Sequence, residues 1–189
     1  THIPGLNVVI PSTPRDAYGL MRTVLQTPGV TLFFEDREIP DESVTAEDQE
    51  YAGCIELGQG FSRRGYTRVP KLTIVTYGLS RYLVDKVLED NKGSRLWSKT
   101  ELLDLRTLYP IDWELIRSSV DMTDNLLIVE PDGQYGGIGA EIAATIAEER
   151  PGTRIKRLGG RRQIIPASPA LHDTMVPTEE EIRDAICNY

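Results

Sequence analysis

The sequence is poor in the residues that build disulfides, nucleophilic sites and metal centres. In 189 residues it has two cysteines and two histidines: Cys54, Cys187, His2 and His172. The cysteines are far apart and lie outside any metal-ligand spacing, so we expect no disulfide framework. Neither histidine has a serine, cysteine or acid beside it at a catalytic or ligand spacing. This favours surface or interface positions for both.

Positive charge and long apolar runs are also scarce. Asp and Glu total 29 against 21 Lys and Arg, which gives a net charge of -8. This balance argues against non-specific binding to nucleic acid or an anionic membrane, and it suits a basic protein partner. No apolar run approaches the roughly 20 residues of a membrane-spanning helix, and no secretory signal is recognisable. We therefore expect a cytoplasmic protein that does not bind nucleic acid or membrane.

Residues 1–38 follow the pattern of a strand, a helix and a second strand. Residues 6–10 form a β-rich apolar run. A cap, a first-turn proline and an acid then come at Thr13, Pro14 and Asp16. Apolar residues at helical spacing follow, and the run VTLFFE predicts the next strand. A crossover of this length implies two parallel strands with the helix on one face.

Residues 39–69 lack this regularity and are interpreted as a linker that could contain a hairpin at 54–66. From residue 70 to residue 189, strands and helices alternate again. Strands are expected at 72–78, 101–108, 125–130 and 154–158, and helices at 80–91, 112–120, 139–150 and from Thr178 onward. This order predicts an α/β domain with a mostly parallel sheet and helices on both faces. The strand–helix–strand of residues 1–38 would belong to a second α/β domain.

Four stretches carry a family resemblance: PGLNVVIPSTP at 4–14, LDLRTLYPID at 103–112, IVE at 128–130 and GGIGAEI at 136–142. In this order they resemble the beta subunits of thiamine-diphosphate-dependent 2-oxo-acid dehydrogenases of the pyruvate or branched-chain type. The resemblance runs essentially end to end. It implies that residues 1–38 are the end of the pyrimidine-binding domain and that residues 70–189 are the transketolase-like C-terminal domain.

The resemblance also implies that catalysis needs groups this sequence lacks. Thiamine chemistry requires a carboxylate against the aminopyrimidine ring and a magnesium-bound diphosphate held by a Gly-Asp-Gly…Asn motif. In the family the glutamate lies upstream of the segment matching Thr1, and the diphosphate motif lies on the alpha subunit. Asp132-Gly133 lacks the rest of that motif. We therefore assign no catalytic or cofactor-binding residue here and expect no activity from the chain alone.

The implied partners are an alpha-type subunit, a chain that carries the missing pyrimidine-domain half and a lipoyl acyltransferase. The resemblance points to an acidic C-terminal interface at Glu179, Glu180, Glu181 and Tyr189. Acids at a helix N-terminus are also favourable for the helix dipole alone. Together the complex would decarboxylate a 2-oxo acid and transfer the acyl group, as a dehydrogenase or a related carboligase.

The turn after the first helix could hold a monovalent cation. In the family, backbone carbonyls at this turn bind potassium, and by alignment they would belong to Val24, Leu25, Thr27 and Gly29. Carbonyl ligation depends on backbone shape more than on side chains. An ordinary helix end is the alternative interpretation.

Other local motifs have ordinary structural readings. The loop DGQYGGIG between a strand and a helix is interpreted as a tight turn that permits close packing, with an anion site as the alternative. The pairs Arg63-Arg64 and Arg161-Arg162 are expected to be solvated loop charge, or else to bind a carboxylate. Arg106 is expected to make a structural ion pair or to bond loop carbonyls.

The sequence leaves two rival functions open. One is a non-catalytic module that docks partners and has no thiamine site. The other is a subunit of a transketolase-like sugar enzyme, against which the run DLRTLYPID favours the dehydrogenase branch.

Overall fold

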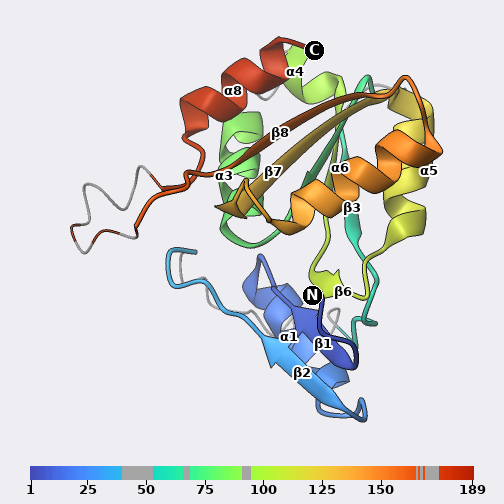
Figure 1. The fold of residues 1–189 in the computed structure, drawn as a ribbon, viewed down its shortest axis with the longest axis vertical. Helices are drawn as coiled ribbons and strands as arrows, with labels where there is room; N and C mark the ends of the chain where they lie inside the picture. The colour runs from blue at the N-terminus through green and yellow to red at the C-terminus, as the bar shows by residue number, and fades with distance from the viewer. Residues whose placement is uncertain (40–52, 66–68, 91–94, 165, 167, 169–174) are drawn as a thin grey trace.

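A computed structural model describes residues 1–39, 53–65, 69–90, 95–164, 166, 168 and 175–189. They form two sheets, a small one near the N-terminus and a larger one that is covered by helices (Figure 1). Among these residues, no helix is long and apolar enough to cross a membrane.

The small sheet has the strand order β2-β1-β6. Strand β1 (Leu6–Val9), helix α1 (Pro14–Val24) and strand β2 (Val30–Phe33) form the expected parallel strand–helix–strand. Thr13 caps α1 by accepting a hydrogen bond from the Asp16 amide, as the sequence predicts. The third strand, β6 (Thr107–Tyr109), pairs antiparallel with β1 across about a hundred residues of sequence.

The larger sheet has the strand order β3-β5-β4-β7-β8. Its strands are β3 (Phe61–Arg64), β4 (Leu72–Thr76), β5 (Thr100–Asp104), β7 (Asn125–Gly133) and β8 (Arg154–Gly160). All neighbouring pairs are parallel except β3 with β5. The mostly parallel sheet of the sequence prediction is therefore confirmed, with β8 at one edge.

Helices cover both faces of this sheet (Figure 1). They are α3 (Gly78–Glu89), α4 (Arg95–Ser98), α5 (Trp113–Thr123), α6 (Ile138–Glu149) and α8 (Glu179–Cys187). One core layer joins α3 and α8 to Ile74 and Leu127. The other joins α5 and α6 to Val75 and Ile128. Successive residues of a strand thus pack into opposite core layers, as expected for a sheet buried on both sides.

Two local expectations differ from the structure. Within the range interpreted as a linker, β3 pairs with β5, and the described residues 53–65 contain no hairpin. The single strand expected at 101–108 is divided into β5 and β6, which belong to different sheets. The division falls at Arg106, whose φ of 59° turns the chain out of the extended conformation. The Arg106 carbonyl then accepts a hydrogen bond from the Ile10 amide at 2.8 Å.

The final helix begins as the sequence predicts. The Thr178 hydroxyl accepts from the Glu181 amide, and the Glu181 carboxylate accepts from the Thr178 amide, which completes a capping box. Ile182, Ala185 and Ile186 form its buried stripe. The helix is therefore fixed to the core from its first turn.

Candidate functional site

The carboxyl ends of the parallel strands face the small sheet. In open α/β sheets, ligands usually bind where the strand order reverses, which here is between β4 and β7. A Cβ added at Gly78, just after β4, would lie 3.1 Å from the Ile10 side chain and 4.0 Å from Pro131. Apolar side chains therefore pack against Gly78 itself, and this point belongs to the junction between the two sheets. Leu79 and Pro131, which lie beside it, line a hollow at the ends of β7 and β8.

A charged cluster holds this junction together. The Arg106 guanidinium lies 2.6 Å from the Asp16 carboxylate, and both side chains are nearly buried. The Ser12 hydroxyl donates to the Asp104 carboxylate at 3.0 Å. Arg81 lies 3.8 Å from the other Asp104 oxygen, which has no hydrogen-bond partner within the described part of the chain. Of the two roles expected for Arg106, an ion pair or bonds to loop carbonyls, the structure shows the ion pair, which ties α1 to the loop after β5.

Asp104 is the member of this cluster whose protonation is most perturbed. Burial, together with the neighbouring Asp16 carboxylate, raises its pKa to about 6 against the opposing effects of Arg81, the Ser12 hydrogen bond and Arg106. Burial also lowers the pKa of Arg81. The side chain of Asp104 is 1% exposed, so it is not open to a substrate and serves the junction.

A second buried carboxylate, Glu130, lies at the end of the β7 apolar run. It accepts from the Gly139 amide at 2.8 Å and pairs with Arg157 at 3.0 Å. Burial raises its pKa despite these partners. A Cβ on Gly139 would lie 2.5 Å from a Glu130 oxygen, and one on Gly137 would lie 2.6 Å away.

The glycine loop is therefore a packing device. Glu130 takes the position at the N-terminus of α6 where a phosphate would otherwise bind. This agrees with the interpretation of the loop as a tight structural turn, and the Gly139 amide is not available to a phosphate.

The arginine pairs behave differently from each other. Arg63 and Arg64 lie on β3 and not on a loop, so the expectation of solvated loop charge was wrong for them. Arg63 pairs with Asp85 at 2.9 Å, and Arg64 pairs with the buried Glu101 at 2.7 Å. Arg161 lies 3.2 Å from Glu181, and Arg162 lies over the Tyr135 ring.

The acidic C-terminal residues have partners within the chain. Glu179 binds Lys86 at 2.5 Å, and Glu181 serves the capping box. Glu180 is exposed. The Tyr189 hydroxyl donates to the Leu126 carbonyl at 3.1 Å. The predicted interface at these four residues stays a prediction, with Glu180 and Glu181 as its exposed acids.

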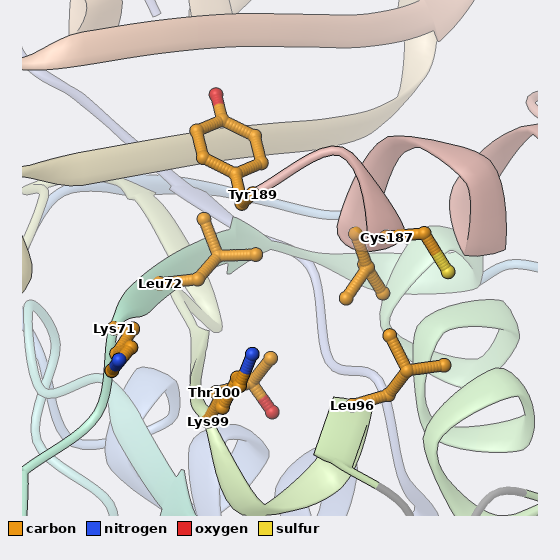
Figure 2. Close-up of a pocket in the computed structure, with 8 residues that line it drawn as sticks. Lys71, Leu72, Leu96, Lys99, Thr100, Cys187 and Tyr189 are labelled. Carbon is orange, nitrogen blue, oxygen red and sulfur yellow. The ribbon is translucent and has the colours of Figure 1, made fainter.

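Figure 2 shows the small cavity between the end of α8 and the starts of β4 and β5. Its lining includes Leu72, Leu96, Thr100, Cys187 and Tyr189. The volume of about 60 Å³ is too small for a cofactor.

The turn after α1 is a hydrogen-bonded helix end. The Val24 carbonyl accepts from the Thr27 amide at 3.1 Å, and the Thr27 hydroxyl donates to the Thr23 carbonyl at 2.8 Å. Gly29 has a φ of 109°, which lets the chain turn into β2. A monovalent cation at the carbonyls of Val24, Leu25, Thr27 and Gly29 stays a prediction.

Two larger hollows lie near the loops. One of about 720 Å³ is lined by Thr1, His2, Tyr109, Trp113 and Glu141, among others. The other, of about 640 Å³, lies beside the ends of β7 and β8. Within the described ranges, no three His, Cys, Asp or Glu side chains are grouped to hold a metal ion.

Known proteins share the fold of this chain. The family model for the transketolase C-terminal domain matches residues 67–182. The chain belongs to this family. It is 32% identical over 98% of its length to the 2-oxoisovalerate dehydrogenase subunit beta 2 of Arabidopsis thaliana, covering 50% of that protein. It is 33% identical over 88% of its length to the 2-oxoisovalerate dehydrogenase subunit beta of Bacillus subtilis, covering 49%.

Other relatives extend the comparison. An acetoin:2,6-dichlorophenolindophenol oxidoreductase subunit beta from Cupriavidus necator is 32% identical to this chain. The matched region covers 98% of this chain and 54% of that protein. A solved structure described as a split gene transketolase, inactive beta4 tetramer, has a TM-score of 0.75 at 19% identity, over 99% of this chain and 58% of that one. That likeness shows the fold alone. This transketolase C-terminal-domain chain thus spans about half the length of the curated relatives it matches.

The buried acids of the junction are not placed to hold thiamine diphosphate. Asp104 and Glu130, the acids whose pKa burial raises, are committed to partners in the interior. The N-terminus of α6 is filled by a carboxylate. The site that this chain offers is therefore a rigid junction with external surfaces, and no step of thiamine chemistry is assigned to its residues.

Proposed function

We propose that these 189 residues form the C-terminal, assembly-bearing half of a beta-type subunit in a thiamine-diphosphate-dependent 2-oxo-acid dehydrogenase or a related carboligase. The observation that carries the proposal is the similarity to beta subunits of such enzymes, at 32% identity over 98% of the chain. Because the match covers strands of both sheets, it supports a common arrangement and not only a common domain type.

In this proposal the chain supplies shape and subunit contacts. The Asp16–Arg106 and Ser12–Asp104 contacts hold the small sheet in one orientation against the large one. A fixed orientation matters because catalytic groups that are misplaced by about 1 Å can lose two orders of magnitude in rate. The cofactor, with magnesium at its diphosphate, would be held by residues outside this sequence, and it would supply the decarboxylation and acyl transfer.

The proposed partners follow from the same relationship. An alpha-type subunit would supply the diphosphate cradle, and a polypeptide segment with the front of the pyrimidine-binding domain would supply the glutamate. A lipoyl acyltransferase is the proposed partner for the acidic surface around Glu180, because a basic binding domain would complement its charge. A potassium ion at the turn after α1 is part of the proposal.

The test compares the chain alone with the chain in a reconstituted assembly. The chain is mixed with the alpha subunit and the unmatched portion of the beta subunit of the Bacillus subtilis 2-oxoisovalerate dehydrogenase. Calorimetry then measures thiamine diphosphate binding, and CO₂ release measures 2-oxo-acid decarboxylation. We expect both only in the mixture. Tight cofactor binding by the isolated chain would show that the location assigned to the cofactor groups is wrong.

One rival has an observation in its favour. Because Asp104 and Glu130 are both committed to partners within the chain, a non-catalytic docking module would present the same junction and surfaces. It would bind the partner subunits but leave the mixture without thiamine diphosphate binding. That combination of results would replace the catalytic-subunit proposal with the docking module.

A further inference from the structure

The small cavity in Figure 2 has a mainly apolar interior. Leu72, the first residue of β4, and Ile186, from the buried stripe of α8, line it and are 2% and 4% exposed. Leu96 of α4 lines the same space and packs against the same core layer. Cavities lined by apolar side chains stay dry and accept apolar ligands. The interior is therefore suited to a hydrocarbon group.

Two lysines line the side of the cavity at the starts of β4 and β5. The register of these strands pairs Leu72 with Thr100, so the preceding residues, Lys71 and Lys99, are also neighbours. The Lys71 and Leu72 amides both donate to the Lys99 carbonyl, at 2.7 Å and 3.1 Å. Both lysines lie across the cavity from Cys187 (Figure 2). Neither forms an ion pair within the described part of the chain. Because lysine has a flexible stem, both ammonium groups can reach an anion in the cavity.

The Tyr189 ring forms another wall and is held in place. Its hydroxyl donates to the Leu126 carbonyl at 3.1 Å, and the Arg154 guanidinium lies 4.6 Å from the ring centroid. Arg154 also brings a third positive charge to this end of the sheet, in a chain whose net charge is -8. A local group of cations raises the concentration of anions near it. The fixed wall and the cations thus favour an anionic ligand of defined shape.

The volume of the cavity limits the length of the ligand. About 60 Å³ is room for about four to six water molecules, at about 10–15 Å³ each. An apolar tail of this size with a negatively charged end matches both the interior and the lysines.

We propose that the cavity binds a short aliphatic carboxylate of the size of isobutyrate. Its tail lies between Leu72 and Ile186, and its carboxylate lies at Lys71 and Lys99. The inference goes beyond the proposed function and does not rest on it. All of the binding groups belong to this one chain, so the ligand needs no partner subunit.

The experiment uses the full 189-residue chain and its two cysteines. Cys187 is exposed and lines the cavity, whereas Cys54 is exposed elsewhere and serves as the internal reference. Alkylation of each thiol by iodoacetamide is followed by mass spectrometry at constant pH and ionic strength. We expect about 50 mM isobutyrate to slow alkylation of Cys187 at least about threefold, by mass action with a millimolar dissociation constant. Alkylation of Cys54 should not change.

Two further probes separate the contributions of charge and tail. Isobutyramide has the same shape without the charge, and acetate has the charge without the tail, so neither should protect Cys187 measurably. Equal protection by isobutyramide, slower alkylation of both cysteines, or no protection by isobutyrate would overturn the inference.

Substitutions test the assignment of the carboxylate to the lysines. Lys71→Gln and Lys99→Gln should each weaken isobutyrate binding about fivefold in calorimetry, which corresponds to the loss of one exposed ion pair. Arg162→Gln is the matched control, because it removes the same charge beyond the opposite end of β8 and should leave binding unchanged. Unchanged binding in both lysine variants would overturn the assignment. The alkylation measurement on the unmodified chain decides the matter even if a variant fails to fold.

Discussion

Replacing Asp104 with asparagine tests the charged junction between the two sheets. The pKa of Asp104 is raised from 3.8 to about 6, mainly by burial and by the nearby Asp16 carboxylate. A raised folded-state pKa means that this group's contribution to stability is fully present below pH 3.8. The contribution is lost as the pH rises through about 6. The difference in pKa corresponds to about 3 kcal/mol, of which about 2 kcal/mol develops between pH 4.5 and pH 8.

The groups that face Asp104 come from every element packed around it. Asp16 lies on α1, Arg81 on α3 and Arg106 on the loop after β5, and these side chains set the balance of charge. Asparagine keeps an oxygen to accept from Ser12 and the Arg106 amide, so the junction should still form. The substitution removes the ionisable group, and with it the contribution of Asp104 to the pH dependence of the free energy of unfolding.

The assay is urea unfolding of both proteins from pH 4.5 to pH 8. The free energy of unfolding of Asp104→Asn, relative to the unmodified chain, should rise by about 2 kcal/mol across this range. Asp124→Asn is the matched control, because Asp124 is exposed and has a φ of 53° that asparagine adopts readily. Profiles that stay parallel within about 0.5 kcal/mol, a typical effect of a surface change, would refute the reasoning.

Two further predictions concern the helix starts. Gly139→Ala should lower the melting temperature, because the new methyl group would collide with Glu130 and overpacking costs about 1–3 kcal/mol. Its gain in helix propensity, about 1 kcal/mol, is the smaller effect, so a rise in melting temperature would contradict the packing role of the loop. Thr178→Ala should cost about 1 kcal/mol in urea unfolding through loss of the capping box. Thr178→Ser, which keeps the hydroxyl, should recover most of it.

Local features of this fold could be predicted from the sequence, whereas long-range ones could not. The caps at Thr13 and Thr178 and the alternation of strands and helices depend on neighbouring residues, and they appear where the pattern indicates. The pairing of Arg64 with Glu101 joins residues 37 positions apart. It exists only because β3 lies beside β5, and sequence spacing gives no sign of that.

The candidate site shows the same division. The ion pair of Arg106 was expected, but its partner Asp16 could not be named before the two sheets were placed against each other. The role of Glu130 was also missed. The glycines at 137 and 139 were the available signal for it. Two positions without side chains at the start of α6 leave room for a buried side chain, which here is Glu130. The predicted partner interface at the C-terminal acids and the predicted cation site at the carbonyls after α1 both involve molecules other than this chain. Both therefore stay predictions.

Strand β6 has a consequence for how the chain can be divided. It lies between β5 and β7 of the large sheet in sequence but pairs with β1, so the small sheet contains a strand from the part of the chain that forms the large one. Truncation before residue 67, where the family match begins, would leave β6 beside empty space and expose the Arg106 loop. The small sheet should accordingly lose its stability when the rest of the chain is removed, because β1 would lose its antiparallel partner strand and Asp16 would lose Arg106.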